Sequence, residues 1–154
     1  MAILVDLAFS TFTTADTVGE IRVIDGDTLV YGDQKIRLAC VDAPEKGQAG
    51  WLFSKTLLET KVSGKSLNIK QVGKDAYGRI VGIVTYQEKN VNLEMLGEGG
   101  AMTNFDNKRH CNDEKDSFIA AEEKAIAAQV GIWSPPAYPP IPPSTFRKLK
   151  SFLK

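Results

Sequence analysis

The sequence lacks most of the features that mark several common protein classes. Its 154 residues contain only two cysteines, Cys40 and Cys111, which are too few for a disulfide framework, and no C-x-x-C pair indicates a zinc site. The single histidine, His110, follows a polar loop without an evident partner, so we expect it to be a solvated residue. No apolar run approaches the length of a membrane span. These absences argue against a disulfide-stapled scaffold, a cysteine zinc site and a transmembrane helix within this sequence.

The chain also lacks net charge, since Lys and Arg together number 19 and so do Asp and Glu. Bulk electrostatic attraction to nucleic acid is therefore absent, and any binding of a polyanion must come from a local patch. The last eleven residues are the exception, with four basic groups and no acid: Arg147, Lys148, Lys150 and Lys154. A hydrophobic content of 43% at this length predicts one globular domain with a real core.

The two ends of the chain differ from the middle. Residues 1–16 contain a short apolar stretch that resembles part of a signal peptide, but Asp6 interrupts it and no basic residue precedes it, so a signal remnant and an ordinary N-terminal arm both stay open. Six of the seven prolines fall within residues 135–143, which predicts a polyproline spacer. Beyond it, 144–154 can form a short amphipathic helix. We expect a tail over 135–154 that is disordered, with weak contact to a partner or an anionic membrane as the alternative.

Between these ends, residues 17–134 predict one domain of class α+β. Short β-branched and aliphatic runs separated by turn residues predict five strands: Val18–Ile24, Thr28–Tyr31, Lys35–Val41, Ser66–Val72 and Ile80–Tyr86. Apolar residues at helical spacing predict about three helices: Gly50–Lys61, Asn92–Gly97 and Asp113–Val130. This order, mainly β with helices, suits a five-stranded barrel of the OB-fold type, closed or partly closed.

Acidic residues follow two of the predicted strands. Asp25 and Asp27 lie in the turn after the first strand, and Asp42 and Glu45 come just after the third. Adjacent antiparallel strands can bring Asp27 beside Asp42. Two carboxylates, a backbone carbonyl and waters are ligands that suit Ca²⁺. Taken alone, Asp-Gly-Asp is more often an ordinary turn than a metal site.

Two arginines shift that balance towards catalysis. Strand alternation puts Arg37 on the face opposite Ile36 and Leu38, and Arg79 opens the fifth strand. A phosphodiester gains negative charge on the way to its transition state, so guanidinium groups beside a metal and a carboxylate are the set that its hydrolysis needs. Each arginine alone is more often a surface salt-bridge partner. The combination indicates a phosphodiesterase.

Three blocks of the sequence resemble the signature of the staphylococcal nuclease (thermonuclease) family. They are Ile24–Thr28 (IDGDT), Ile36–Glu45 (IRLACVDAPE) and Asp75–Arg79 (DAYGR). The end of the last predicted helix and the segment up to Trp133 and Ser134 are also similar to that family. The resemblance covers roughly Val18 to Ser134.

The resemblance implies an OB-fold nuclease that depends on calcium, cuts DNA and/or RNA with little sequence specificity and leaves 3′-phosphate ends. It also implies roles for individual positions: Asp27 and Asp42 as carboxylate ligands of Ca²⁺, Ala43 as a carbonyl ligand, Glu45 as general base, Arg37 and Arg79 as phosphate-binding and transition-state groups, and Tyr77 and Phe105 as substrate-binding residues. The segment 46–50 is shorter than the lysine-bearing loop of the family's prototype, which predicts a weaker grip on substrate.

A rival hypothesis is a binding module, in which the same barrel with weak or lost catalysis contacts nucleic acid or protein. Degraded copies usually lose acids or arginines, and none of the five catalytic candidates is missing here. No stable protein partner is evident, so we expect a monomer whose partner is its DNA or RNA substrate.

The two cysteines leave two interpretations open, free buried thiols or one bridge. We expect a Cys40–Cys111 disulfide, because Cys40 shares its predicted strand face with core residues, Cys111 precedes a helix that must pack on the barrel, and relatives in the family carry cysteines near these positions. A bridge argues for an oxidising compartment. We therefore expect an exported protein, secreted or periplasmic, with a cytoplasmic location as the alternative.

Overall fold

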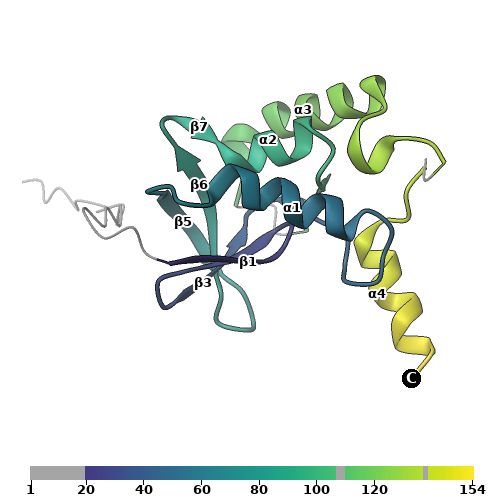
Figure 1. Cartoon of the computed structure of the whole chain (residues 1–154), viewed down its shortest axis with the longest axis horizontal. Helices are drawn as coiled ribbons and strands as arrows, with labels where there is room; N and C mark the ends of the chain where they lie inside the picture. Colours follow the sequence, from purple (N-terminus) through teal and green to yellow (C-terminus); the bar gives the residue numbers. More distant parts are fainter. Residues whose placement is uncertain (1–19, 107–109, 137–138) are drawn as a thin grey trace, which may run out of the picture.

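The computed structural model describes residues 20–106, 110–136 and 139–154 (Figure 1). Five strands form a mixed sheet in the order β1-β2-β3-β6-β5, and β7 adds to β6. The sheet strands are β1 Ile21–Asp25, β2 Thr28–Tyr31, β3 Gln34–Leu38, β5 Asn68–Lys74, β6 Ile80–Tyr86 and β7 Lys89–Asn90. Neighbours in this order are antiparallel except for β3 and β6, which run parallel. In the described part of the chain no pairing joins β1 to β5, so the sheet curves without closing.

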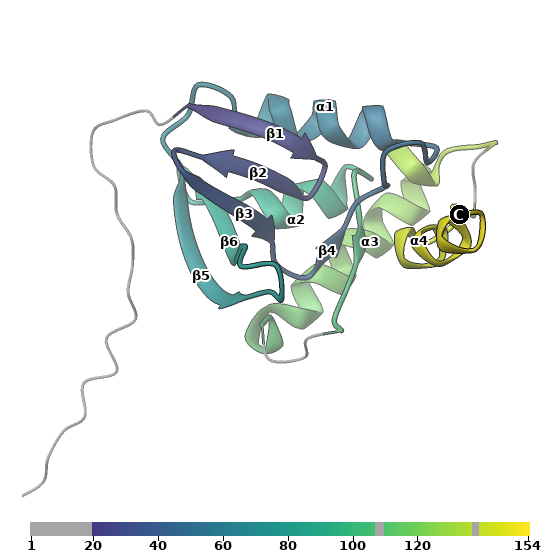
Figure 2. The same cartoon turned by 90° about the horizontal axis from the view of Figure 1, so that it is seen from below.

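Helices cover one side of this sheet. The helices are α1 Trp51–Val62, α2 Val91–Gly97, α3 Lys115–Ala128 and α4 Pro143–Phe152, with short 3₁₀ turns at Asn112–Glu114 and Gly131–Trp133. Figures 1 and 2 show α1, α2 and α3 gathered together on the sheet, whereas α4 stands apart from them. None of the helices in the described ranges combines the length and the apolar character that a bilayer crossing requires.

The core lies between the sheet and the three helices. Its fully buried side chains come from strands and helices alike: Leu29, Ile36, Leu38, Leu58, Met95, Leu96 and Phe118. Buried Asn92 joins the layers, since its Nδ2 donates to the carbonyls of Ala39 and Gly82 at 3.0 and 3.1 Å and its Oδ1 accepts from Val84 N–H. A polar group can be buried at such a place because all its hydrogen bonds are made.

The predicted class α+β is confirmed, and most predicted elements lie within two residues of the observed ones. The first strand begins at Ile21, since Glu20 precedes it outside the strand, and the predicted start at Val18 lies outside the described residues. One boundary was wrong: the strand predicted over Lys35–Val41 ends at Leu38. Cys40 takes a left-handed conformation, φ 61°, and the chain turns there. A separate strand follows, β4 Val41–Asp42, which pairs with β8 Met102–Thr103.

Strands of two residues, such as β4, β7 and β8, are too short to show alternation, so the sequence pattern missed them. The three predicted helices correspond to α1, α2 and α3, which lie on the sheet, and α4 is a fourth helix. The possible helix over 144–154 is present as α4, Pro143–Phe152, and the tail contacts the domain through Ile141, so the expectation of a disordered tail was wrong for this part. Trp133 is buried against Ala125 and Ile132.

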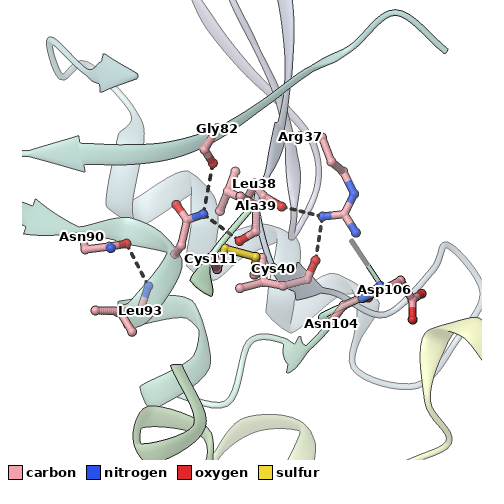
Figure 3. Close-up of a disulfide and its surroundings, with 12 residues drawn as sticks. Arg37, Leu38, Ala39, Cys40, Gly82, Asn90, Leu93, Asn104, Asp106 and Cys111 are labelled. Carbon is pink, nitrogen blue, oxygen red and sulfur yellow. Dashed lines mark hydrogen bonds between the residues drawn. A yellow bond between two sulfur atoms is a disulfide. The ribbon is translucent and has the colours of Figure 1, made fainter. Parts of the chain in front are cut away.

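The predicted Cys40–Cys111 disulfide is confirmed, with 6.5 Å between the two Cα atoms (Figure 3). The reasoning behind it was partly wrong, since Cys40 lies in the turn after β3 and not within the strand. Its side chain is nevertheless buried, as is that of Cys111. The bridge fastens the turn between β3 and β4 to the segment that leads into α3.

Candidate active site

Asp27 and Asp42 lie together at one end of the sheet. Asp27 sits in the turn between β1 and β2, Asp42 belongs to β4, and both are almost fully buried, at 6% and 4% exposure. Asp27 Oδ2 accepts a hydrogen bond from the N–H of Ala43 at 2.7 Å, and its Oδ1 accepts from the Thr28 hydroxyl at 2.8 Å. The prediction that this turn lies beside the segment 42–43 is confirmed.

The helix α1 holds that turn in place. A Cβ at Gly26 would lie 1.7 Å from the hydroxyl oxygen of Ser54 on α1, so only glycine allows this close approach. The indole N–H of Trp51, the first residue of α1, donates to Asp25 Oδ1 at 2.7 Å. Asp25 is thus paired with a helix residue, while the neighbouring Asp27 faces β4.

Arg37 connects the two buried acids. Its Nη2 lies 3.4 Å from Asp27 Oδ2 and 3.3 Å from Asp42 Oδ1. Its Nη1 donates to the carbonyls of Leu38 and Val41, at 3.0 and 2.7 Å. Figure 3 shows Arg37 and its hydrogen bond with Leu38 in the surroundings of the disulfide. The side chain is only 16% exposed, so it is a half-buried group held by four partners rather than a freely solvated one.

Arg79 is held by a local turn. Asp75 Oδ1 accepts from the backbone N–H groups of Tyr77 and Arg79, at 2.9 and 3.0 Å, and its Oδ2 accepts from Arg79 Nε at 2.5 Å. Burial by itself would raise the pKa of the Asp75 carboxyl, but these hydrogen bonds from Arg79 and Tyr77 outweigh it and lower that pKa. The ring of Tyr77 is 86% exposed and its centre lies 5.6 Å from the Arg79 guanidinium carbon.

The two arginines meet in one surface pocket of about 210 Å³. Its remaining walls include Lys74, Asn104, Asp106 and His110. The prediction that His110 is solvated was wrong, because it is half-buried and its ring packs so close to Gly73 that a Cβ there would lie 2.5 Å from Nε2. The neighbouring Cys111 was the available signal, since its bridge to Cys40 draws His110 to this side of the sheet.

Glu45, the predicted base, contacts a residue that the sequence reasoning did not place here. Arg147 of α4 donates from Nη1 to Glu45 Oε1 at 2.6 Å and to Asp42 Oδ1 at 3.1 Å, and from Nη2 to Asp42 Oδ2 at 3.0 Å. The hydrogen bond with Asp42 is the main reason that the pKa of Arg147 is raised above its ordinary value, although burial opposes the rise. No local pattern links these positions, which are more than a hundred residues apart.

Comparison of the sequence with known protein families agrees with the grouping of these acids and arginines. The family model described as "Staphylococcal nuclease homologue" matches residues 35–135. The chain belongs to the staphylococcal nuclease family. The predicted OB-fold class is that of this family, and the expectation drawn from the three sequence blocks is confirmed at the level of the family.

Several proteins named as nucleases are similar to this chain over most of their own length. An "Uncharacterized endonuclease" of Haemophilus influenzae is 37% identical, over 86% of this chain and 74% of its own. An "Uncharacterized endonuclease" of Escherichia coli is 32% identical over 88% of both chains. A protein named "Micrococcal nuclease" from Shigella flexneri is 31% identical, over 88% of this chain and 84% of its own.

Phe105 lies at the border of the arginine pocket of this family member. It follows Asn104, which lines that pocket, and its ring packs half-buried against the main core with the Lys115 ammonium 5.5 Å from its centre. Phe105 itself is not among the residues that line this pocket, although its neighbours Asn104 and Asp106 are. Its substrate-binding role stays a prediction.

A cation fits the acidic end of the site by its charge. In the described residues no cluster of three or more His, Cys, Asp or Glu side chains forms a metal site, and the predicted Ca²⁺ site needs only two carboxylates, a carbonyl and waters. Asp27, Asp42 and Glu45 carry three negative charges. Arg37 and the docked Arg147 supply two positive charges, which leaves a surplus of one negative charge, or of two without Arg147. The guanidinium of Arg147 shows that a cation is attracted to this place.

Proposed function

We propose that this protein is a calcium-dependent nuclease that hydrolyses phosphodiester bonds in DNA and/or RNA with little sequence specificity and leaves 3′-phosphate ends. The observation that carries the proposal is the contact of Arg37 with both buried acids, Asp27 and Asp42, next to the pocket it shares with Arg79. Relatives named endonuclease and micrococcal nuclease support nuclease activity.

The proposed Ca²⁺ ligands are the carboxylates of Asp27 and Asp42 and the carbonyl of Ala43. When bound, the ion supplies Lewis-acid charge to the phosphate and orients a water. Asp27 is held ready for this role by its bonds to Ala43 N–H and the Thr28 hydroxyl, so its carboxylate does not have to be ordered on binding.

The remaining residues handle the phosphate and the proton. Glu45 takes a proton from the attacking water as the water oxygen bonds to phosphorus. The bond to the 5′ oxygen then breaks, that oxygen takes up a proton from the solvent, and Glu45 returns its own proton to the solvent. The products are a 3′-phosphate and a 5′-hydroxyl. Arg37 and Arg79 bind phosphate oxygens and stabilise the charge that grows there. Their anchors, the Leu38 and Val41 carbonyls and the Asp75 carboxylate, orient them beforehand.

Cleavage of DNA and RNA by the purified protein in calcium, in magnesium and in chelator tests the proposal. We expect cleavage in calcium and little in magnesium, because magnesium demands octahedral geometry and binds its waters tightly. Analysis of the product ends should find 3′-phosphates. Equal rates in chelator and in calcium would contradict the calcium role. Nucleic-acid binding without any cleavage would favour the binding module instead.

Two substitutions separate the metal ligand from the base. Asp42→Asn should lower both calcium affinity and cleavage, whereas Glu45→Gln should lower cleavage about a hundredfold or more and keep calcium affinity better. Asp33→Asn is the matched control, since Asp33 lies exposed in the turn between β2 and β3. If Glu45→Gln cleaves at the wild-type rate, Glu45 is not the base.

We also propose that the protein is exported, to the periplasm or the outside of the cell. The Cys40–Cys111 disulfide supports this, since such bridges persist in oxidising compartments. The signal remnant considered for residues 1–16 lies outside the described residues. The monomeric state stays a prediction.

A further inference from the structure

The C-terminal helix α4 places a cation on the acids that the proposed chemistry needs. Both guanidinium Nη atoms of Arg147 bind Asp42, one to each carboxylate oxygen, and Nη1 also reaches Glu45. Such a two-pronged contact is the strong form of an arginine–carboxylate pair. The side chain of Asp42 is 5% exposed, so water screens little of this pair on the Asp42 side.

Contacts before Arg147 bring the tail to this position. Gln48, in the loop after Glu45, donates from Nε2 to the carbonyl of Ile141 at 2.5 Å, and Pro143 at the start of α4 is buried. Ile141 and the half-buried Phe146 face Pro44 and Ile132 of the domain across an open space of about 590 Å³. The tail is therefore held by the contact with Gln48, the buried Pro143 and the ion pair.

The remainder of α4 is loosely attached. Leu149, Phe152 and Leu153 are exposed, at 51%, 84% and 87%, so the apolar side of the last helical turn packs on nothing in the described structure. Arg147 itself is 43% exposed. The Arg147–Asp42 pair is buried on the Asp42 side but open to water on the Arg147 side, and few other contacts hold the tail. A ligand with higher affinity for the same acids can therefore displace it.

We propose that α4 is an autoinhibitory element in which Arg147 and a divalent cation compete for Asp42. The inference rests on the proposed function, in which Asp42 is a metal ligand and Glu45 the base. With the tail docked, both oxygens of Asp42 and one oxygen of Glu45 accept hydrogen bonds from the guanidinium. With the tail released, the surplus of two negative charges around Arg37 is available to the cation. Calcium binding and tail release are then linked, and each must favour the other by the same factor.

The expected change in calcium affinity follows from the fraction of molecules in which the tail is docked. If the tail is docked in about nine of ten molecules, the apparent calcium affinity is lowered about tenfold relative to a chain whose tail is free. Arg147→Ala in the full-length protein should therefore bind calcium about tenfold more tightly, as measured by isothermal titration calorimetry. Phe146→Ala loosens the tail without a change in charge and should shift the affinity in the same direction. Lys148→Ala is the matched control, because it removes one exposed charge from the same helix.

Tail release is measured independently of activity. Nitroxide labels on Ser151→Cys and Thr60→Cys, one at the end of α4 and one in α1, report the position of the tail by electron–electron double resonance. We expect a narrow distance distribution in chelator that becomes long and broad as calcium is added. In Arg147→Ala the broad distribution should be present without calcium. Cleavage by Arg147→Ala should exceed the wild type at limiting calcium and equal it at saturation.

The outcomes separate the two proposals. Equal calcium affinities in the wild type and Arg147→Ala, with a label distance that calcium does not change, would overturn the autoinhibition and leave the nuclease site intact. Cleavage that falls in Arg147→Ala at saturating calcium would also overturn it, since Arg147 would then assist the substrate. An absence of calcium binding in both proteins would overturn the proposed metal site together with the competition.

Discussion

Replacement of Arg37 by alanine should damage both the stability and the activity of the protein. From the sequence alone, Arg37→Ala and Arg79→Ala are both expected to remove activity and leave the fold intact. The structure changes this expectation for Arg37, because its guanidinium satisfies two carbonyls and pairs with two acids that are 6% and 4% exposed. In the alanine variant the two carbonyls lose this donor and the two acids lose the cation between them. Asp27 keeps its hydrogen bonds from Ala43 N–H and the Thr28 hydroxyl, and Asp42 keeps those from Arg147.

The magnitude follows from what is left unpaired. Hydrogen bonds to charged groups contribute roughly 1.5–3 kcal/mol, and removal of one partner of a buried pair costs about 3–5 kcal/mol. Because Arg37 keeps 16% of its side chain exposed, we expect the lower end, a loss of about 3 kcal/mol in the free energy of unfolding. For a chain of this size that corresponds to a melting temperature lower by roughly 6–12 °C.

Urea unfolding followed by tryptophan fluorescence measures this loss, in chelator so that bound calcium does not stabilise the folded state. Arg79→Ala is the comparison, since its ion pair with Asp75 is local and near the surface and should contribute below about 1 kcal/mol. Both variants should lose about a hundredfold or more in cleavage. If Arg37→Ala unfolds at the same urea concentration as Arg79→Ala, the reasoning about its buried partners is refuted.

Three further predictions concern stability. Reduction of the disulfide, which joins positions 71 residues apart, should lower the free energy of unfolding by about 4 kcal/mol in the chain-entropy model, and mass spectrometry after alkylation without reductant should find no modified cysteine. Asp75→Asn should destabilise at pH 7. Because folding lowers the pKa of Asp75, its carboxylate contributes to the free energy of unfolding above the pKa that it has in the unfolded chain. This contribution is lost as the pH falls through the pKa in the folded protein. The melting temperatures of the variant and the wild type should therefore converge in acid, below about pH 4. Deletion of residues 135–154 should leave a folded domain, because the buried Trp133 precedes the cut; a chain without cooperative unfolding would contradict this.

The sequence by itself determined the local features of this protein. Short β-branched runs between Asp-Gly and Gly-Asp turns specify β1 to β3, and the alanine-rich, lysine- and glutamate-rich stretch specifies α3, because turn chemistry and periodicity act between residues close in the chain. The site candidates Asp27, Asp42, Arg37 and Arg79 were found from their places at the ends and on the faces of the predicted strands, and Ala43 was added by the resemblance to the nuclease family.

Only the tertiary structure decided which distant groups meet. The parallel pairing of β3 with β6, the packing of His110 against Gly73 and the left-handed turn at Cys40 depend on how separate elements fit together. The position of Arg147 on Asp42 and Glu45 is the clearest case. The proline-rich spacer before Arg147 predicts a segment that cannot enter the core, but it does not predict the direction in which the chain continues. A contact across more than a hundred residues also leaves no periodic pattern in the sequence.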